Sequence, residues 1–137
     1  MAITNASEVV PFDAGEVTRA VQDATTGTVR SIVEYDREEF NPLYVDDVTM
    51  AFYADEAEML DHFAEIHSYV HVDFTEMSLF TEELFPVANE VRYLTASFDT
   101  MTLLRIYFGD EGVFVSLDPE VSVEPIVDAV EAVYSAS

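Results

Sequence analysis

Three histidines in one short stretch come closest to forming a metal site. His62, His67 and His71 follow one another along the chain. Imidazole nitrogens are good zinc ligands, but they must point to the same side of a helix to share an ion. His62 and His67 lie five residues apart, which turns them about 140° from each other. Only His67 and His71, four residues apart, remain weak candidates. Surface histidines are the favoured interpretation, so we expect no metal and no other cofactor.

Carboxylates are the other groups that could carry out acid–base chemistry. The chain has 28 aspartates and glutamates, so neighbouring pairs such as Asp46–Asp47 and Glu82–Glu83 arise by chance. A catalytic pair would need burial that perturbs its pKa, and most of these carboxylates are expected to be solvated. The sequence has no cysteine, no glycine-rich phosphate loop and no serine nucleophile elbow. We therefore assign no catalytic residue, and a metal- or carboxylate-dependent enzyme is the least favoured alternative.

The scarce cations are more informative than the abundant anions. There is no lysine, and five arginines are scattered along the chain. Alternation along the predicted strands places Arg92 and Arg105 on one sheet face, together with Tyr107 and Phe114. Two guanidinium groups beside aromatic rings could hold an anionic ligand or the carboxylate of a partner. Internal salt bridges at a strand edge are the favoured interpretation, and the four residues are kept as candidates for ligand or partner binding.

The overall composition limits the partners that the protein can have. Its net charge is −23, yet 50% of its residues are hydrophobic, so the chain is expected to fold rather than remain disordered. Such an acidic composition is typical of halophilic proteins, because at about 1 M salt the screening length is only ~3 Å and the carboxylates hardly repel one another. Binding to nucleic acid or to an anionic membrane requires clustered cations, so neither is expected as a partner.

The apolar periodicity predicts four helices and five strands in a single domain over residues 1–137. Residues 1–11 are expected to form a loose N-terminal arm without the features of a signal peptide. No apolar stretch is long enough to span a membrane, so a cytoplasmic protein is predicted. Helices are expected over 13–25, 55–70, 74–84 and 123–134, and strands over 29–35, 43–45, 91–98, 101–108 and 113–117. Asp13 and Ser122 are the expected N-caps of the first and the last of these helices.

The last three predicted strands form the clearest pattern in the sequence. The connections between them, at 99–100 and 109–112, are so short that only antiparallel hairpins fit. These features predict an α+β fold, with an antiparallel sheet of about five strands and the element order α-β-β-α-(α)-β-β-β-α. One sheet face should be mixed in character, whereas the other is almost entirely apolar and should lie under helices. This apolar face carries Val91, Tyr93, Leu104, Ile106, Phe108, Val113, Val115 and Leu117.

Several segments resemble a known family. Those at 43–48, 89–99, 103–108 and 112–120 are similar to segments of small uncharacterised acidic haloarchaeal proteins. This resemblance implies no activity and no site residues. The order of elements is separately similar to that of the roadblock and longin group, which implies an antiparallel sheet with helices on both faces. Proteins of that group typically dimerise and scaffold small GTPases or signalling partners, an expectation that rests on the fold alone.

These observations together predict a non-enzymatic interaction or regulatory module of a halophilic archaeon. Its partners would be a second copy of the chain and an unknown protein, so that the module acts as a dimeric adaptor. A half-apolar sheet face or a free sheet edge could form the dimer contact. The alternative is a small-ligand-sensing domain with an anion site at Arg92 and Arg105.

Overall fold

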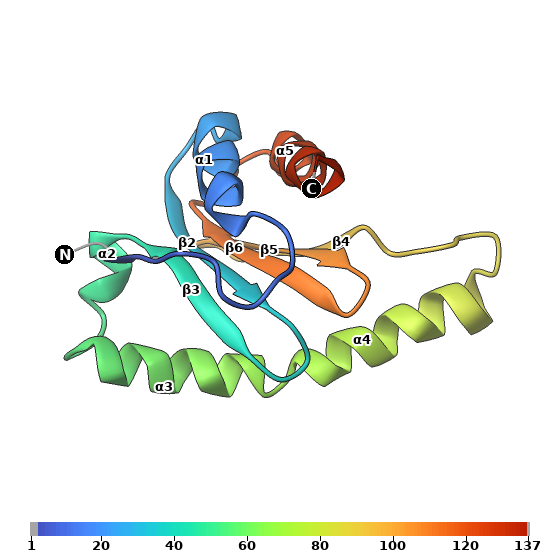
Figure 1. Cartoon of the computed structure of the whole chain (residues 1–137), viewed down its shortest axis with the longest axis horizontal. Helices are drawn as coiled ribbons and strands as arrows, with labels where there is room; N and C mark the ends of the chain where they lie inside the picture. The colour runs from blue at the N-terminus through green and yellow to red at the C-terminus, as the bar shows by residue number, and fades with distance from the viewer. Residues whose placement is uncertain (1–2, 137) are drawn as a thin grey trace.

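The computed structural model describes residues 3–136 and contains one antiparallel sheet with helices on both faces (Figure 1). Its six strands are arranged in the order β1-β3-β2-β6-β5-β4. The predicted α+β class and antiparallel sheet are confirmed, and a short first strand adds to the expected number. The strands are β1 (Ile3–Thr4), β2 (Val29–Tyr35), β3 (Phe40–Val45), β4 (Tyr93–Ser97), β5 (Thr102–Phe108) and β6 (Glu111–Leu117).

The helices form two layers, one on each side of the sheet (Figure 1). The first and last helices, α1 and α5, pack together on one face, which we call the first face. The helices between β3 and β4 lie along the second face, where α4 continues directly into a π-helical segment, η1. No helix within residues 3–136 is both long and apolar enough to cross a membrane. The helical bounds are α1 (Ala14–Ala24), α2 (Asp47–Met50), α3 (Glu56–His67), α4 (Val70–Ser78), η1 (Leu79–Leu84) and α5 (Glu124–Ser135).

Aspartate side chains cap the N-termini of three helices. Asp13, Asp46 and Asp55 are N-caps, and each carboxylate accepts a hydrogen bond from the backbone N–H three residues later. Such bonds satisfy donors that the first helical turn leaves unpaired, and a negative charge there also interacts favourably with the helix dipole. The predicted cap at Asp13 is confirmed. The last helix instead begins without a side-chain cap hydrogen bond, so the expected cap at Ser122 is wrong.

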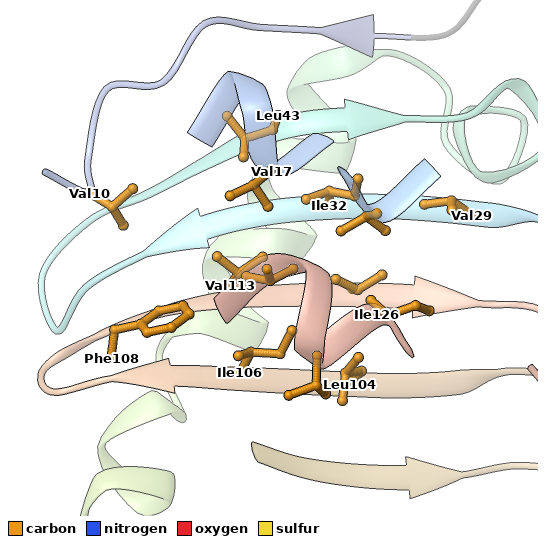
Figure 2. Close-up of a cluster of buried hydrophobic side chains, with 14 of the residues drawn as sticks. Val10, Val17, Val29, Ile32, Leu43, Leu104, Ile106, Phe108, Val113 and Ile126 are labelled. Carbon is orange, nitrogen blue, oxygen red and sulfur yellow. The ribbon is translucent and has the colours of Figure 1, made fainter. Parts of the chain in front are cut away.

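The main hydrophobic core lies between α1, α5 and the first face of the sheet (Figure 2). Alternate residues of each strand point toward the two helices, as the two-residue period of a strand requires. The predicted apolar face is confirmed for its members in β5 and β6. Val91 is an exception, because it precedes β4 and packs against residues of the second face. Fully buried core residues include Val17, Val21, Ile32, Leu43, Leu104, Ile106, Val113, Val115, Leu117, Ile126, Val127 and Val130.

A buried carboxylate holds the N-terminal segment on the sheet. Glu34 of β2 is 0% exposed and accepts hydrogen bonds of 2.8–2.9 Å from the backbone N–H groups of residues 8–10. Asn41 of β3 donates a further hydrogen bond of 2.7 Å to this carboxylate. The prediction of a loose arm is therefore wrong for residues 3–10, because the folded-back segment supplies backbone donors that this buried carboxylate needs. Residues 1–2 of the predicted arm lie outside the described residues.

Candidate functional site

A cleft of about 1040 Å³ lies between α3 and the second face of the sheet. Strands β2, β6, β5 and β4 form its floor, and α2, α3 and the start of α4 form its walls. Alternation along the paired strands brings one set of side chains to this floor. The floor residues are Ser31, Val33, Ala96, Leu103, Arg105, Phe114 and Ser116.

Two serines form the polar centre of the floor. The hydroxyl oxygens of Ser31 in β2 and Ser116 in β6 lie 2.5 Å apart in a hydrogen bond, and both residues are buried. They face each other in the regular antiparallel register of β2 and β6, and the irregularity of this pairing lies beyond them, between Val29 and Ser31. Each hydroxyl therefore already has a partner inside the protein, as buried polar groups require.

A buried carboxylate on α4 joins the helical layer to the sheet beside the cleft. Asp73 is only 9% exposed, and its Oδ1 accepts a hydrogen bond of 2.6 Å from Nη1 of Arg105 in β5. Its Oδ2 accepts a second hydrogen bond of 2.8 Å from the hydroxyl of Tyr107. Both carboxylate oxygens are thus paired, which makes the burial of this charge tolerable. We call Asp73, Arg105, Tyr107 and the adjacent Tyr35 the Asp73 cluster. This cluster fixes the position of α4 on the second face.

Burial changes the acid–base properties of the two tyrosines in this cluster. Desolvation raises the pKa of Tyr107, and the neighbouring Tyr35 hydroxyl and Asp73 carboxylate raise it further. Desolvation, followed by the charge of Asp73, also raises the pKa of Tyr35. The Tyr35 hydroxyl is buried next to that of Tyr107 without a hydrogen bond of good geometry. Both phenols remain protonated at neutral pH, so they can donate hydrogen bonds but cannot act as bases.

A glycine makes room for the ring of Tyr35. Gly112 of β6 lies opposite Tyr35 in the sheet. A Cβ atom at position 112 would lie 2.6 Å from Cζ of Tyr35 and 2.7 Å from its hydroxyl oxygen. Non-bonded atoms do not approach so closely, because attraction gives way to steep repulsion well before this distance. The aromatic ring therefore crosses β6 at a position that has no side chain.

The structure separates the two arginines that the sequence predicts on one face. Arg92 precedes β4 and turns toward α5, where its Nη2 donates a hydrogen bond of 2.6 Å to Oε1 of Glu131. Arg105 lies on the second face of the sheet with the other two candidates, Tyr107 and Phe114. The prediction of a shared face is therefore wrong for Arg92. The alternation of side chains along a strand does not extend to Arg92, which lies outside β4. The carboxylates of α5 attract its long side chain instead.

The histidines lie in separate environments. His67 is the last residue of α3, and its Nε2 lies 2.8 Å from the carbonyl oxygen of Asp36. His71 belongs to α4, beyond the break between the two helices, and is exposed. His62 contacts the hydroxyl of Tyr53 through Nδ1 at 2.7 Å. In the part of the chain that the structure describes, no group of three or more histidine or carboxylate side chains is placed to hold a metal ion.

Two members of the Asp73 cluster were absent from the predicted site residues, Asp73 itself and Tyr35. A signal for Asp73 exists in the sequence. Asp73 lies on the apolar stripe of its helix, next to Phe74 and four residues before Met77. A carboxylate on such a stripe requires a buried partner. No comparable signal marks Tyr35, because tyrosine is common in strands for reasons of packing alone.

A comparison with models of known protein families shows which family this chain belongs to. The family model described as a domain of unknown function, DUF7522, matches residues 15–135. The chain belongs to the DUF7522 family. The predicted membership of an uncharacterised family is thus confirmed. No curated protein matches the chain.

The DUF7522 chain is also similar to a solved structure, that of a roadblock/LC7 domain from Streptomyces avermitilis. The two share 12% sequence identity over 87% of this chain and 88% of that chain, with a TM-score of 0.53. At this level of identity, the likeness establishes the fold alone. The predicted roadblock-like arrangement of elements is therefore confirmed.

Proposed function

We propose that this chain is a non-enzymatic adaptor or regulatory module that works as a homodimer in a halophilic cytoplasm. Its partners would be a second copy of the chain and a further protein. The observation that carries this proposal is the free edge of β4, which borders a group of exposed apolar side chains. The roadblock-like fold supports an interaction role by analogy.

Strand β4 ends the sheet, with no strand on its outer side among the described residues. The hydrogen bond from the Phe98 N–H to the Met101 carbonyl sets which backbone groups of β4 face β5. By alternation, the backbone groups of the intervening positions point away from the sheet. Such unpaired donors and acceptors can bind the same edge of a second copy in an isologous dimer. The outward groups belong to Tyr93, Thr95 and Ser97.

Exposed apolar side chains extend from the start of α4 to the loop before β4. This part of the chain continues beyond the sheet on the β4 side (Figure 1). Contiguous apolar surface is a feature of interaction sites rather than of ordinary exposed surface. It would be covered if a second copy paired along β4. The residues are Tyr69, Val72, Leu79, Leu84, Phe85 and Val87.

The acidic charge makes such a dimer dependent on salt. Two copies with a net charge of −23 each repel strongly in dilute buffer, because the screening length at about 0.01 M is ~30 Å. At about 1 M the screening length falls to ~3 Å, and the apolar contact then outweighs the repulsion. The dimer and the fold should therefore both be strongest at molar salt.

The oligomeric state tests this proposal. Light scattering should give the mass of a dimer in about 2 M KCl and a smaller mass near about 0.01 M. Thr95→Pro removes an outward N–H, a position where an edge strand tolerates proline, so this variant should be monomeric. Thr95→Ala is the matched control, because it loses the same hydrogen bond to the Leu103 carbonyl but keeps the N–H.

Two results would count against the proposal. A wild-type monomer at high salt, or a dimeric Thr95→Pro variant, would exclude pairing through β4. Circular dichroism across the same KCl series examines the halophilic part separately. An unchanged melting temperature between dilute and molar salt would show that the acidic surface is not an adaptation to salt.

A further inference from the structure

We infer that the cleft under α3 is a binding site for an uncharged, planar aromatic small molecule. The cleft lies on the second face of the sheet and meets the proposed dimer contact at Tyr69, whereas the pairing in that contact uses the outer backbone groups of β4, which Thr95→Pro alters. Ligand binding and dimer formation are therefore separable by experiment.

The size of the cleft indicates room for an occupant. Its volume of about 1040 Å³ matches the upper end of the range for small-molecule pockets, about 300–1,000 Å³. Protein interiors rarely leave voids larger than a water molecule, because atoms that line a void lose dispersion contacts. The first face of the same sheet is filled in this ordinary way by α1 and α5. The second face differs, because the cleft leaves part of the area beneath α3 unfilled.

Specific contacts hold the walls of the cleft apart. Met59, which is completely buried, anchors the first half of α3. At the end of α3, His67 contacts the carbonyl oxygen of Asp36 after β2. Further along, Asp73 binds Arg105 of the floor. Because the helical layer is fixed at both ends, the cleft is preformed, and its collapse would break these contacts.

The charged groups of the cleft already have partners. Nη2 of Arg30 lies 2.7 Å from Oδ1 of Asp118, and its Nη1 lies 3.4 Å from Oδ2 of Asp46. Arg105 is paired with Asp73 at 2.6 Å. An anionic ligand would have to displace one of these carboxylates and approach a chain of net charge −23. A cationic ligand would find the same carboxylates occupied, so the ligand that fits is uncharged.

A peptide segment fits the floor less well than a ring system does. Strands β2, β6 and β5 are paired on both sides, so they offer no free backbone groups to an inserted chain. The hydroxyls of Ser31 and Ser116 are bonded to each other. A peptide buried here would leave its own N–H and C=O groups without partners, which is costly. An aromatic molecule brings few polar atoms and avoids this cost.

Aromatic side chains from distant parts of the sequence line the cleft. Phe63 comes from α3, Phe114 from β6 and Phe98 from the connection between β4 and β5. Phe52 follows α2 and is 79% exposed, although it borders the cleft. Rings of this kind favour a flat aromatic partner through stacked and edge-to-face contacts. Filling the cleft would also remove part of the Phe52 ring from water.

Titration with Nile red, an uncharged polycyclic dye, tests this assignment at high salt. We expect a saturable rise in emission for the wild type. Ala96→Trp fills the floor and should weaken binding by about tenfold or more. Ser97→Trp is the matched control, because this exposed neighbour on the same strand points to the opposite face. Its affinity should stay within about twofold of the wild type.

Further measurements keep the test decisive if Ala96→Trp does not fold. Phe52→Ser alters an exposed side chain, so the fold should persist while the affinity falls by roughly threefold. The Thr95→Pro variant should bind the dye as the wild type does, whatever its oligomeric state.

Several outcomes would overturn the cleft site. These are binding that does not saturate, equal affinity of Ala96→Trp and Ser97→Trp, and unchanged affinity in Phe52→Ser. Loss of binding in Thr95→Pro would show that the dye occupies the dimer contact instead. Tighter binding of the anionic dye ANS than of Nile red would exclude an uncharged ligand class.

Discussion

The two faces of the sheet are held to their helices in different ways. Beneath α1 and α5, buried aliphatic side chains from both layers fill the space. Beneath α3 and α4, a small aromatic cluster and one partly buried ion pair connect the layers beside an open cleft. Aliphatic burial is non-directional and stabilises the whole fold, whereas directed polar contacts fix the position of a helix without filling the space around it. One sheet can thus keep its main core on one face and accessible surface on the other.

Adjacent leucines in β5 provide the largest expected contrast between the faces. Leu104 is completely buried in the first face, whereas Leu103 lines the cleft and is partly exposed. Leu104→Ala should lower the free energy of unfolding by about 2–5 kcal/mol, because it leaves a cavity in a packed core. Leu103→Ala should cost less than about 1.5 kcal/mol, because this side chain borders open space. Urea unfolding at constant high salt measures both, and equal losses would mean that the two faces are packed alike.

The first face could be predicted from the sequence because its signal is regular and local. Buried residues such as Leu104 and Ile106 recur at every second position, and the short hairpin connections fix how the last three strands pair. The second face depends instead on contacts between distant residues. Asp73 and Arg105 lie 32 residues apart, and no local rule pairs them. The contact between Glu34 and the N-terminal segment escaped prediction for the same reason.

High pH should lower the stability of the protein, because buried tyrosines on the second face then lose their protons. Burial raises the pKa of Tyr107, so the folded protein holds this phenolic proton more tightly than the unfolded chain does. The resulting stabilisation is fully present below about pH 10, the pKa of an unfolded tyrosine, and is lost as the pH rises toward the folded pKa. The free energy of unfolding should therefore fall by up to about 1.4 kcal/mol per pH unit from this group.

Tyr107→Phe isolates this contribution. The variant loses the hydrogen bond to Asp73, so its stability at neutral pH should also be lower. The informative quantity is the slope of stability against pH above about 10, which should be shallower than in the wild type. Tyr69→Phe, at an exposed position before α4, is the control for removing a hydroxyl. A slope that Tyr107→Phe leaves unchanged would assign the alkaline transition to another group.

The melting temperature should be much less sensitive to substitution of Arg92 than to substitution of Arg105. The guanidinium of Arg92 pairs with Glu131 on the outside of α5, where water and salt screen the interaction. Arg92→Gln should leave the melting temperature at high salt unchanged within error. Arg105→Gln makes the same substitution on the second face. It leaves the buried Asp73 carboxylate with the Tyr107 hydroxyl as its remaining hydrogen-bond donor, so the melting temperature should fall clearly. If thermal unfolding shows equal losses for both variants, the ion pair on the α5 side stabilises the protein as much as the partly buried pair of Arg105 and Asp73 does. Directed polar contacts would then support both helical layers, and the contrast between the two faces would be one of packing alone.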